Sequence, residues 1–90
     1  MGAFAKAWKA ARLAKGITLR TFCLDNGLQP TNMSKYERGL LKAPGPDKVA
    51  YWLKLLGYGK KSDGFRAVMR WAEYEHHFHI RSTFSKFLND

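Results

Sequence analysis

Two stretches of this sequence carry residue types that could do chemistry. The first, residues 18–39, reads TLRTFCLDNGLQPTNMSKYERG, which is rich in hydroxyls, amides and cations and poor in large apolar residues. Such side chains donate hydrogen bonds to anions and to other polar surfaces. The second stretch holds two acids and three histidines: Glu73, Glu75, His76, His77 and His79. Carboxylates and imidazoles are metal ligands and proton donors or acceptors.

The second stretch lacks the spacing of a metal or catalytic site. Adjacent residues on a helix point about 100° apart, so His76 and His77 diverge, and no HExxH pattern is present. The single cysteine, Cys23, excludes an intramolecular disulfide and a four-cysteine zinc site, and packing as a small buried residue explains it. We therefore expect no enzymatic activity, no metal and no cofactor, and we assign the histidines to an exposed or interface surface.

The charge balance favours a polyanionic partner. The formal net charge is +9, and residues 1–61 hold 12 Lys and Arg against 3 Asp and Glu, whereas residues 62–90 hold 4 of each kind. Cations near phosphates release condensed counterions, so this pattern suits nucleic acid or an anionic membrane surface. No apolar run approaches the roughly 20 residues of a membrane span, and the lone cysteine fits a reducing, cytoplasmic setting.

The first stretch contains residues that typically start and end helices, placed as for two short helices. Thr18 is a natural N-cap, and Gly27 ends the helix that it opens about two turns later. Pro30 suits the first position of a further helix, where its missing N–H would have been unpaired anyway, and this helix runs to about Arg38. The tight link between the two predicts a helix-turn-helix arrangement.

The remaining helices follow from apolar residues at helical spacing. We predict helices over residues 3–15 and 47–56, a further helix from Ser62 and Asp63, and a short one in the tail from Ile80. Ninety residues are too few for two cores, so we expect one compact all-α domain of five helices, or six if the tail forms its own. Residues 1–61 would form its core, with 62–90 as a helical extension.

Residues 12–57, about half of the chain, resemble the helix-turn-helix regulators of the phage-repressor and Xre type. The matching features are Arg12, GITL at 16–19, Cys23, Gly27, Met33, YERG at 36–39, a loop proline and a helix ending in LLGY. The resemblance implies a lambda-repressor-like fold, in which the third helix enters the major groove of DNA and the second lies across the backbone.

The resemblance also implies roles for individual residues. Thr31 and Lys35 match positions that touch base edges, with Ser34 and Pro30 beside them, although proline can offer only apolar contact. The expected phosphate contacts are Thr18, Arg20, Asn32, Arg38 and Lys42. For each cation the alternative is an ordinary solvated surface.

Glu37 needs a different interpretation, because an acid in the DNA-facing half would repel phosphate unless it were neutralised. In relatives its counterpart pairs with an arginine of the first helix, and Arg12 stands at the matching position. The resemblance therefore implies a structural ion pair between Arg12 and Glu37.

The neutral C-terminal third has more aromatic residues than five short helices require. If exposed, they would form a dimer face: Trp71, Tyr74, Phe78, Phe84 and Phe87. A two-fold dimer would hold two recognition helices about 34 Å apart on an inverted-repeat operator. The alternative is that this tail covers the core of its own chain.

Together these features predict a cytoplasmic, sequence-specific double-stranded DNA-binding transcription regulator, which we expect to be an autoregulating repressor. Small proteins of this kind include phage regulators and antitoxins, so a toxin or another protein partner remains open. Two other functions are compatible with the residues. One is a protein inhibitor on the same scaffold, and the other is a peripheral membrane module that inserts Phe4 and Trp8.

Overall fold

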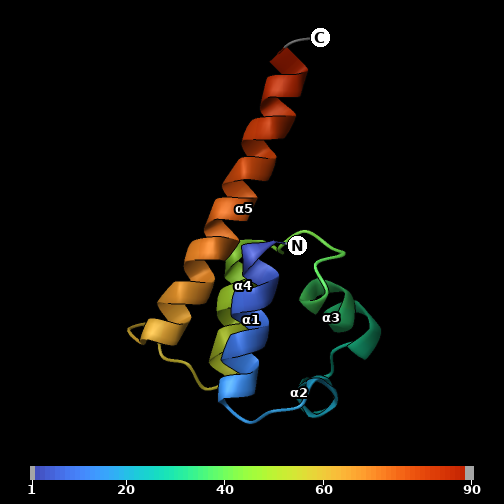
Figure 1. The fold of residues 1–90 in the computed structure, drawn as a ribbon, viewed down its shortest axis with the longest axis vertical. Coiled ribbons are helices and arrows are strands. Elements are labelled where there is room, and N and C mark those ends of the chain that lie inside the picture. Colours follow the sequence, from blue (N-terminus) through green and yellow to red (C-terminus); the bar gives the residue numbers. More distant parts are fainter. Residues whose placement is uncertain (1, 89–90) are drawn as a thin grey trace.

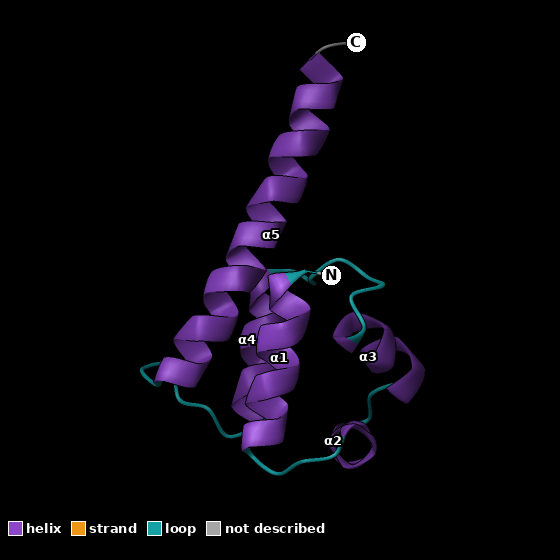
Figure 2. Ribbon diagram, viewed as in Figure 1, coloured by secondary structure: helices purple, strands orange, loops and turns teal. Residues whose placement is uncertain are grey.

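The computed structural model describes the backbone of residues 2–88 and the side chains of residues 2–76. Within this part the chain is helical and has no strand, which confirms the predicted all-α class (Figure 2). The helices are α1 (Ala3–Ala14), α2 (Leu19–Asn26), α3 (Pro30–Glu37), α4 (Pro46–Leu55) and α5 (Asp63–Leu88). The possible sixth helix is not a separate element, because α5 continues without a break through Ile80.

The core is built around α1. Trp8 is completely buried, and its ring meets those of Phe22 at 5.5 Å and Trp52 at 5.6 Å between centroids. Phe4 and Ala11, about one turn to either side on the same face of α1, are also buried. Aromatic pairs at such distances and tilts stabilise beyond their buried area, so Trp8 joins α1, α2 and α4.

The other helices pack on two sides of α1. It contacts α5 on one side and α3 on the other, while α4 packs against α5 and α2 against α3 (Figure 1). On α5, Val68 and Ala72 are buried in the same core. Glu75 on α5 accepts a hydrogen bond from the Phe4 backbone N–H at 3.2 Å. Gly2, the N-cap residue, has no side chain that could accept a hydrogen bond from the first turn. The Glu75 carboxylate takes this role and satisfies one of the otherwise unpaired amides at the start of α1.

The fourth helix begins one residue earlier than predicted, at Pro46 rather than Asp47. Proline at the first helical position loses no hydrogen bond, and Asp47 then lies in the first turn, where a carboxylate interacts favourably with the helix dipole. The helix ends at Leu55 rather than residue 56, with Leu56 as its C-cap.

The link between α4 and α5 is fastened by Tyr58. Its hydroxyl donates to the carbonyl of Ala11 at 2.7 Å, and the Lys15 ammonium lies 4.5 Å from the centre of its ring. Gly64 also lies against this ring, since an added Cβ there would come within 2.5 Å of the Tyr58 Cε1 atom. Position 64 therefore requires glycine for close approach.

α5 has two different surroundings along its length. Its first half packs on α1 and α4, and its second half extends beyond the other helices (Figure 1). This projection gives the molecule a longest dimension of 47 Å against 30 and 21 Å in the other directions.

Candidate nucleic-acid interface

α2 and α3 form a pair joined by a tight turn. Gly27 ends α2 in the left-handed conformation, with φ of 66°, and the Leu28 N–H closes the helix by donating to the Cys23 carbonyl at 2.9 Å. Gln29 is the N-cap of α3, and Pro30 is its first residue. The predicted end of α2 at Gly27 and the predicted start of α3 at Pro30 are therefore confirmed.

α3 has one face in the core and the other in solvent. Met33 and Glu37 are buried, and the half-buried Tyr36 ring lies 5.4 Å from that of Trp52. The predicted base-contact residues lie on the exposed side: Pro30, Thr31 and Lys35 are exposed and Ser34 is half-buried. The structure thus brings together the four positions expected to touch bases.

The predicted phosphate contacts lie at the protein surface. All five are exposed: Thr18, Arg20, Asn32, Arg38 and Lys42. Arg20 comes from α2, Arg38 is the C-cap of α3, and Lys42 lies in the loop before α4. Exposed cations on α2, at the end of α3 and in the following loop are therefore accessible to phosphates.

The Thr18 hydroxyl makes a second hydrogen bond besides the predicted N-cap bond. Its hydroxyl oxygen accepts from the Thr21 N–H at 3.1 Å, and its O–H donates to Thr21 Oγ1 at 2.8 Å. A hydroxyl has only one hydrogen, so Thr18 cannot also donate to a phosphate while it makes this bond, and the hydroxyl of Thr21 is the donor left to the pair. Sequence reasoning missed Thr21, although the spacing of three residues between two threonines at a helix start was visible.

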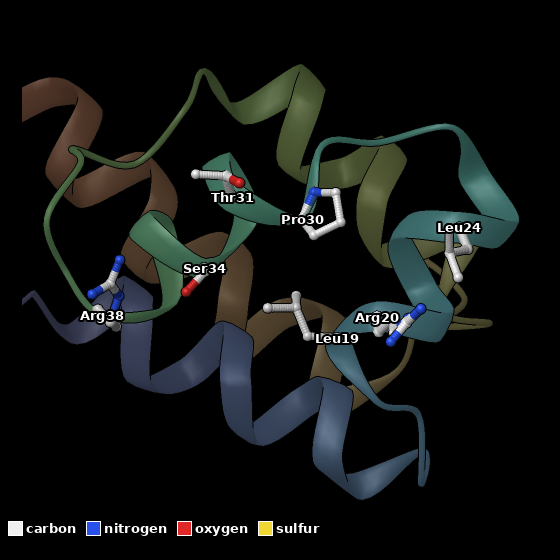
Figure 3. A pocket seen from close by; sticks show the side chains of 7 residues that line it. All are labelled: Leu19, Arg20, Leu24, Pro30, Thr31, Ser34 and Arg38. Atoms are coloured by element: carbon white, nitrogen blue, oxygen red, sulfur yellow. The ribbon is translucent and has the colours of Figure 1, made fainter.

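A groove runs along the outer side of the pair (Figure 3). It is lined by Leu19, Arg20, Leu24, Pro30, Thr31, Ser34 and Arg38. Leu24 contributes an exposed leucine, 66% accessible, on the same side as the predicted base contacts. Leu19 was expected to face inward, and it is half-buried and packs against the core as well as lining the groove. No role was predicted for Leu24.

Arg12 of α1 and Glu37 of α3 are in contact on the buried side of α3. Arg12 Nη2 donates to Glu37 Oε1 at 2.6 Å, and Nε lies 3.2 Å from both carboxylate oxygens. The remaining nitrogen, Nη1, donates to the Ile17 carbonyl at 2.6 Å. The two side chains are only 7% and 5% exposed, so one guanidinium ties together α1, the loop before α2 and the end of α3.

Cys23 lies next to this ion pair and is buried. Burial raises the pKa of its thiol, the Glu37 carboxylate raises it further, and the Arg12 guanidinium acts in the opposite direction. The protonated thiol packs as a small apolar group, as its position in α2 predicted.

The acid and histidine stretch on α5 does not converge in the part that the structure describes. No three His, Cys, Asp or Glu side chains lie close enough there to hold a metal ion. Glu75 instead binds the start of α1, and His76 is half-buried. His77 and His79 fall outside the described side chains.

Two of the five residues predicted for a dimer face are described. Trp71 is 38% exposed and Tyr74 is 61% exposed, and their rings meet edge to face at 6.0 Å. Phe78, Phe84 and Phe87 lie outside the residues whose side chains are described. The described pair forms an exposed aromatic patch near the point where α5 leaves the core.

Comparisons of this chain with family models, with curated proteins and with solved structures found no match. Over the described residues, no helix has both the length and the apolar character needed to cross a membrane. The function must therefore be inferred from the residues and geometry of the chain itself.

Proposed function

We propose that this protein is a sequence-specific double-stranded DNA-binding regulator with a helix-turn-helix fold, in which α3 enters the major groove. The observation that supports this most is the division of α3 into two faces. Met33 and Glu37 fix one face to the core, whereas Thr31 and Lys35 project from the other. A rigid helix with an outward row of hydrogen-bonding side chains is what direct readout of base edges requires.

Charge supports the same proposal. Residues 1–61 hold the whole excess of +9, and cations on α2, on α3 and in the following loop lie around the outward face. DNA carries its charge at regular intervals along both strands, so contacts at the two sides of α3 fix its depth and angle in the groove. Under this proposal, Arg20, Arg38 and Lys42 position the protein and Lys35 contributes to sequence preference.

The Arg12 and Glu37 pair has a supporting role in this function. A free carboxylate close to the exposed face would repel phosphate, but Glu37 is buried and its charge is compensated by Arg12. The pair also fixes the end of α3 relative to α1, which sets the orientation of the row of side chains that faces the bases.

Interfacial insertion of the first helix is disfavoured by the packing. Phe4 and Trp8 are 1% and 0% exposed, so the two side chains needed for a membrane contact are part of the core. α1 therefore presents its lysines to solvent, and Leu13 is the large apolar residue of this helix that is exposed beside them.

We also propose that two copies bind an inverted-repeat operator. Two chains with +9 in residues 1–61 repel each other there, and the neutral region from residue 62 onward is where they can approach. Exposed Trp71 and Tyr74 lie in that region. A repressor of its own or a neighbouring operon is compatible with this mode of binding, and a toxin or other protein is a compatible further partner.

Dimerisation is tested by sedimentation at several protein concentrations. Tyr74→Ser should weaken association, whereas Tyr51→Ser should not, because Tyr51 on α4 is 59% exposed but lies outside the aromatic patch. A monomer at all concentrations, both free and on DNA, would contradict the dimer.

DNA binding is tested by selecting duplexes from a random pool at moderate salt and titrating the selected duplex with salt. The proposal predicts an enriched inverted repeat and an affinity that falls steeply with salt. Retention without any enriched motif would leave a non-specific nucleic-acid binder. Absence of retention by the folded protein would exclude the function and favour a protein-inhibitor role.

A further inference from the structure

The groove between α2 and α3 is more apolar than a surface that reads bases only by hydrogen bonds. Leu19, Leu24 and Pro30 line it together, and Pro30 has neither a side-chain donor nor a backbone N–H. Single exposed leucines are common on protein surfaces and need no explanation. Here, however, the exposed Leu24 is combined with two further apolar side chains in one hollow beside the base-facing residues.

The charged residues that line the same groove favour an anion. Arg20 and Arg38 are among its lining residues, and no acid is. In the view of Figure 3 the two guanidinium groups lie on opposite sides of Leu19. An occupant that matches this lining has a small apolar group at its centre and negative charge to either side.

Duplex DNA presents one group of this kind in the major groove. The C5-methyl group of thymine is the only apolar substituent on an unmodified base pair there, and it stands between two phosphate backbones. Thr31 and Ser34, the uncharged polar residues of the lining, can donate a hydrogen bond to the neighbouring O4 acceptor of thymine. Cytosine and uracil lack the methyl group, so an apolar surface that contacts it distinguishes thymine from both.

We propose that this groove holds the C5-methyl group of a thymine in the operator, with Leu24 and Pro30 as specificity-determining residues. The inference rests on the proposed function, and it adds that one position of each half-site is read through apolar contact. Lys35, which does not line the groove, is then left to read a different base pair.

The test replaces thymine by deoxyuridine, which removes this methyl group and nothing else. In the selected duplex, each thymine of a half-site is replaced in turn, and the dissociation constant is measured for every duplex. Burial of one methyl group corresponds to about a four-fold change in affinity. We expect that loss at one position of each half-site and no change for thymines in the flanks.

Protein variants then locate the contact. Leu24→Ala and Pro30→Ala should bring the ratio of thymine to deoxyuridine affinity close to one, because the apolar lining is reduced. Leu13→Ala is the matched control, since Leu13 is 57% exposed on α1 and does not line the groove. It should leave the ratio unchanged.

The outcomes separate this inference from the proposed function. Specific duplex binding with equal affinity for thymine and deoxyuridine at every position would overturn the inference and leave the function intact. A preference for thymine that persists in both Leu24→Ala and Pro30→Ala would place the contact elsewhere and also overturn it. Failure of the folded protein to bind any duplex would overturn both.

Discussion

The buried ion pair between Arg12 and Glu37 allows a stability prediction of definite size. Replacing one partner leaves the other charge buried, which typically costs about 3–5 kcal/mol. The pair meets the conditions for a cost of this order, because its side chains are 7% and 5% exposed and three contacts join the guanidinium to the carboxylate. A domain of 90 residues has a total stability of about 5–14 kcal/mol, so either single change should remove a large part of it.

The perturbations are Arg12→Met, Glu37→Leu and the double variant, which keep helix-favouring residues of similar size. Each single variant should lose about 3–5 kcal/mol in the free energy of unfolding, measured by urea denaturation. The double variant should be more stable than either single variant, because no charge remains buried. Its residual cost is about 1 kcal/mol from the Ile17 carbonyl, which loses the Arg12 Nη1 donor.

Arg20→Ala is the matched control for these variants. Arg20 is an exposed arginine without a recorded partner in the described structure, so its removal should change the stability by less than about 0.5 kcal/mol. A loss of less than about 1 kcal/mol in the free energy of unfolding for either single variant would match the value of an exposed ion pair. Such a loss would refute the conclusion that burial makes this ion pair costly to break. A double variant less stable than both single variants would also refute it.

Three further predictions concern binding and packing. Lys35→Ala should relax preference at one or two base pairs of the selected duplex, at a cost of about 1–3 kcal/mol, and an unchanged specificity profile would remove Lys35 from base readout. Arg20→Ala and Lys42→Ala should weaken binding to all sequences alike and reduce the slope of log affinity against log salt by about one unit each, so unchanged slopes would contradict the phosphate assignments. Gly64→Ala should lower the free energy of unfolding by about 1–3 kcal/mol through overlap with the Tyr58 ring, whereas Gly59→Ala, in open space, should not, and equal stability of both variants would show that the ring moves aside easily.

Much of the fold could be predicted because its determinants are local. The stripe of Phe4 and Trp8, the N-cap at Thr18 and the left-handed glycine at position 27 each depend on neighbours within one or two helical turns. The contact between Arg12 and Glu37 is not local, and only the resemblance to known regulators indicated it.

What could not be predicted depends on contacts between distant segments. Nothing near Gly64 in the sequence shows that the Tyr58 ring lies against it, and nothing near Glu75 indicates that it binds the start of α1. The apolar groove also escaped prediction, because an exposed leucine such as Leu24 has the same local pattern as a buried one. Tertiary packing decides which side of a short helix remains open, and periodicity over eight residues is too brief to fix that side.

The central claim is that α3 meets DNA with its exposed face. Its most direct test is to titrate the isotopically labelled protein with the selected duplex and to follow the backbone amide signals by NMR. We expect the largest changes at residues 29–35 and at the start of α2, with small changes along residues 63–76 of α5. Changes centred on the lysine face of α1 or on α5, with α3 unaffected, would contradict it.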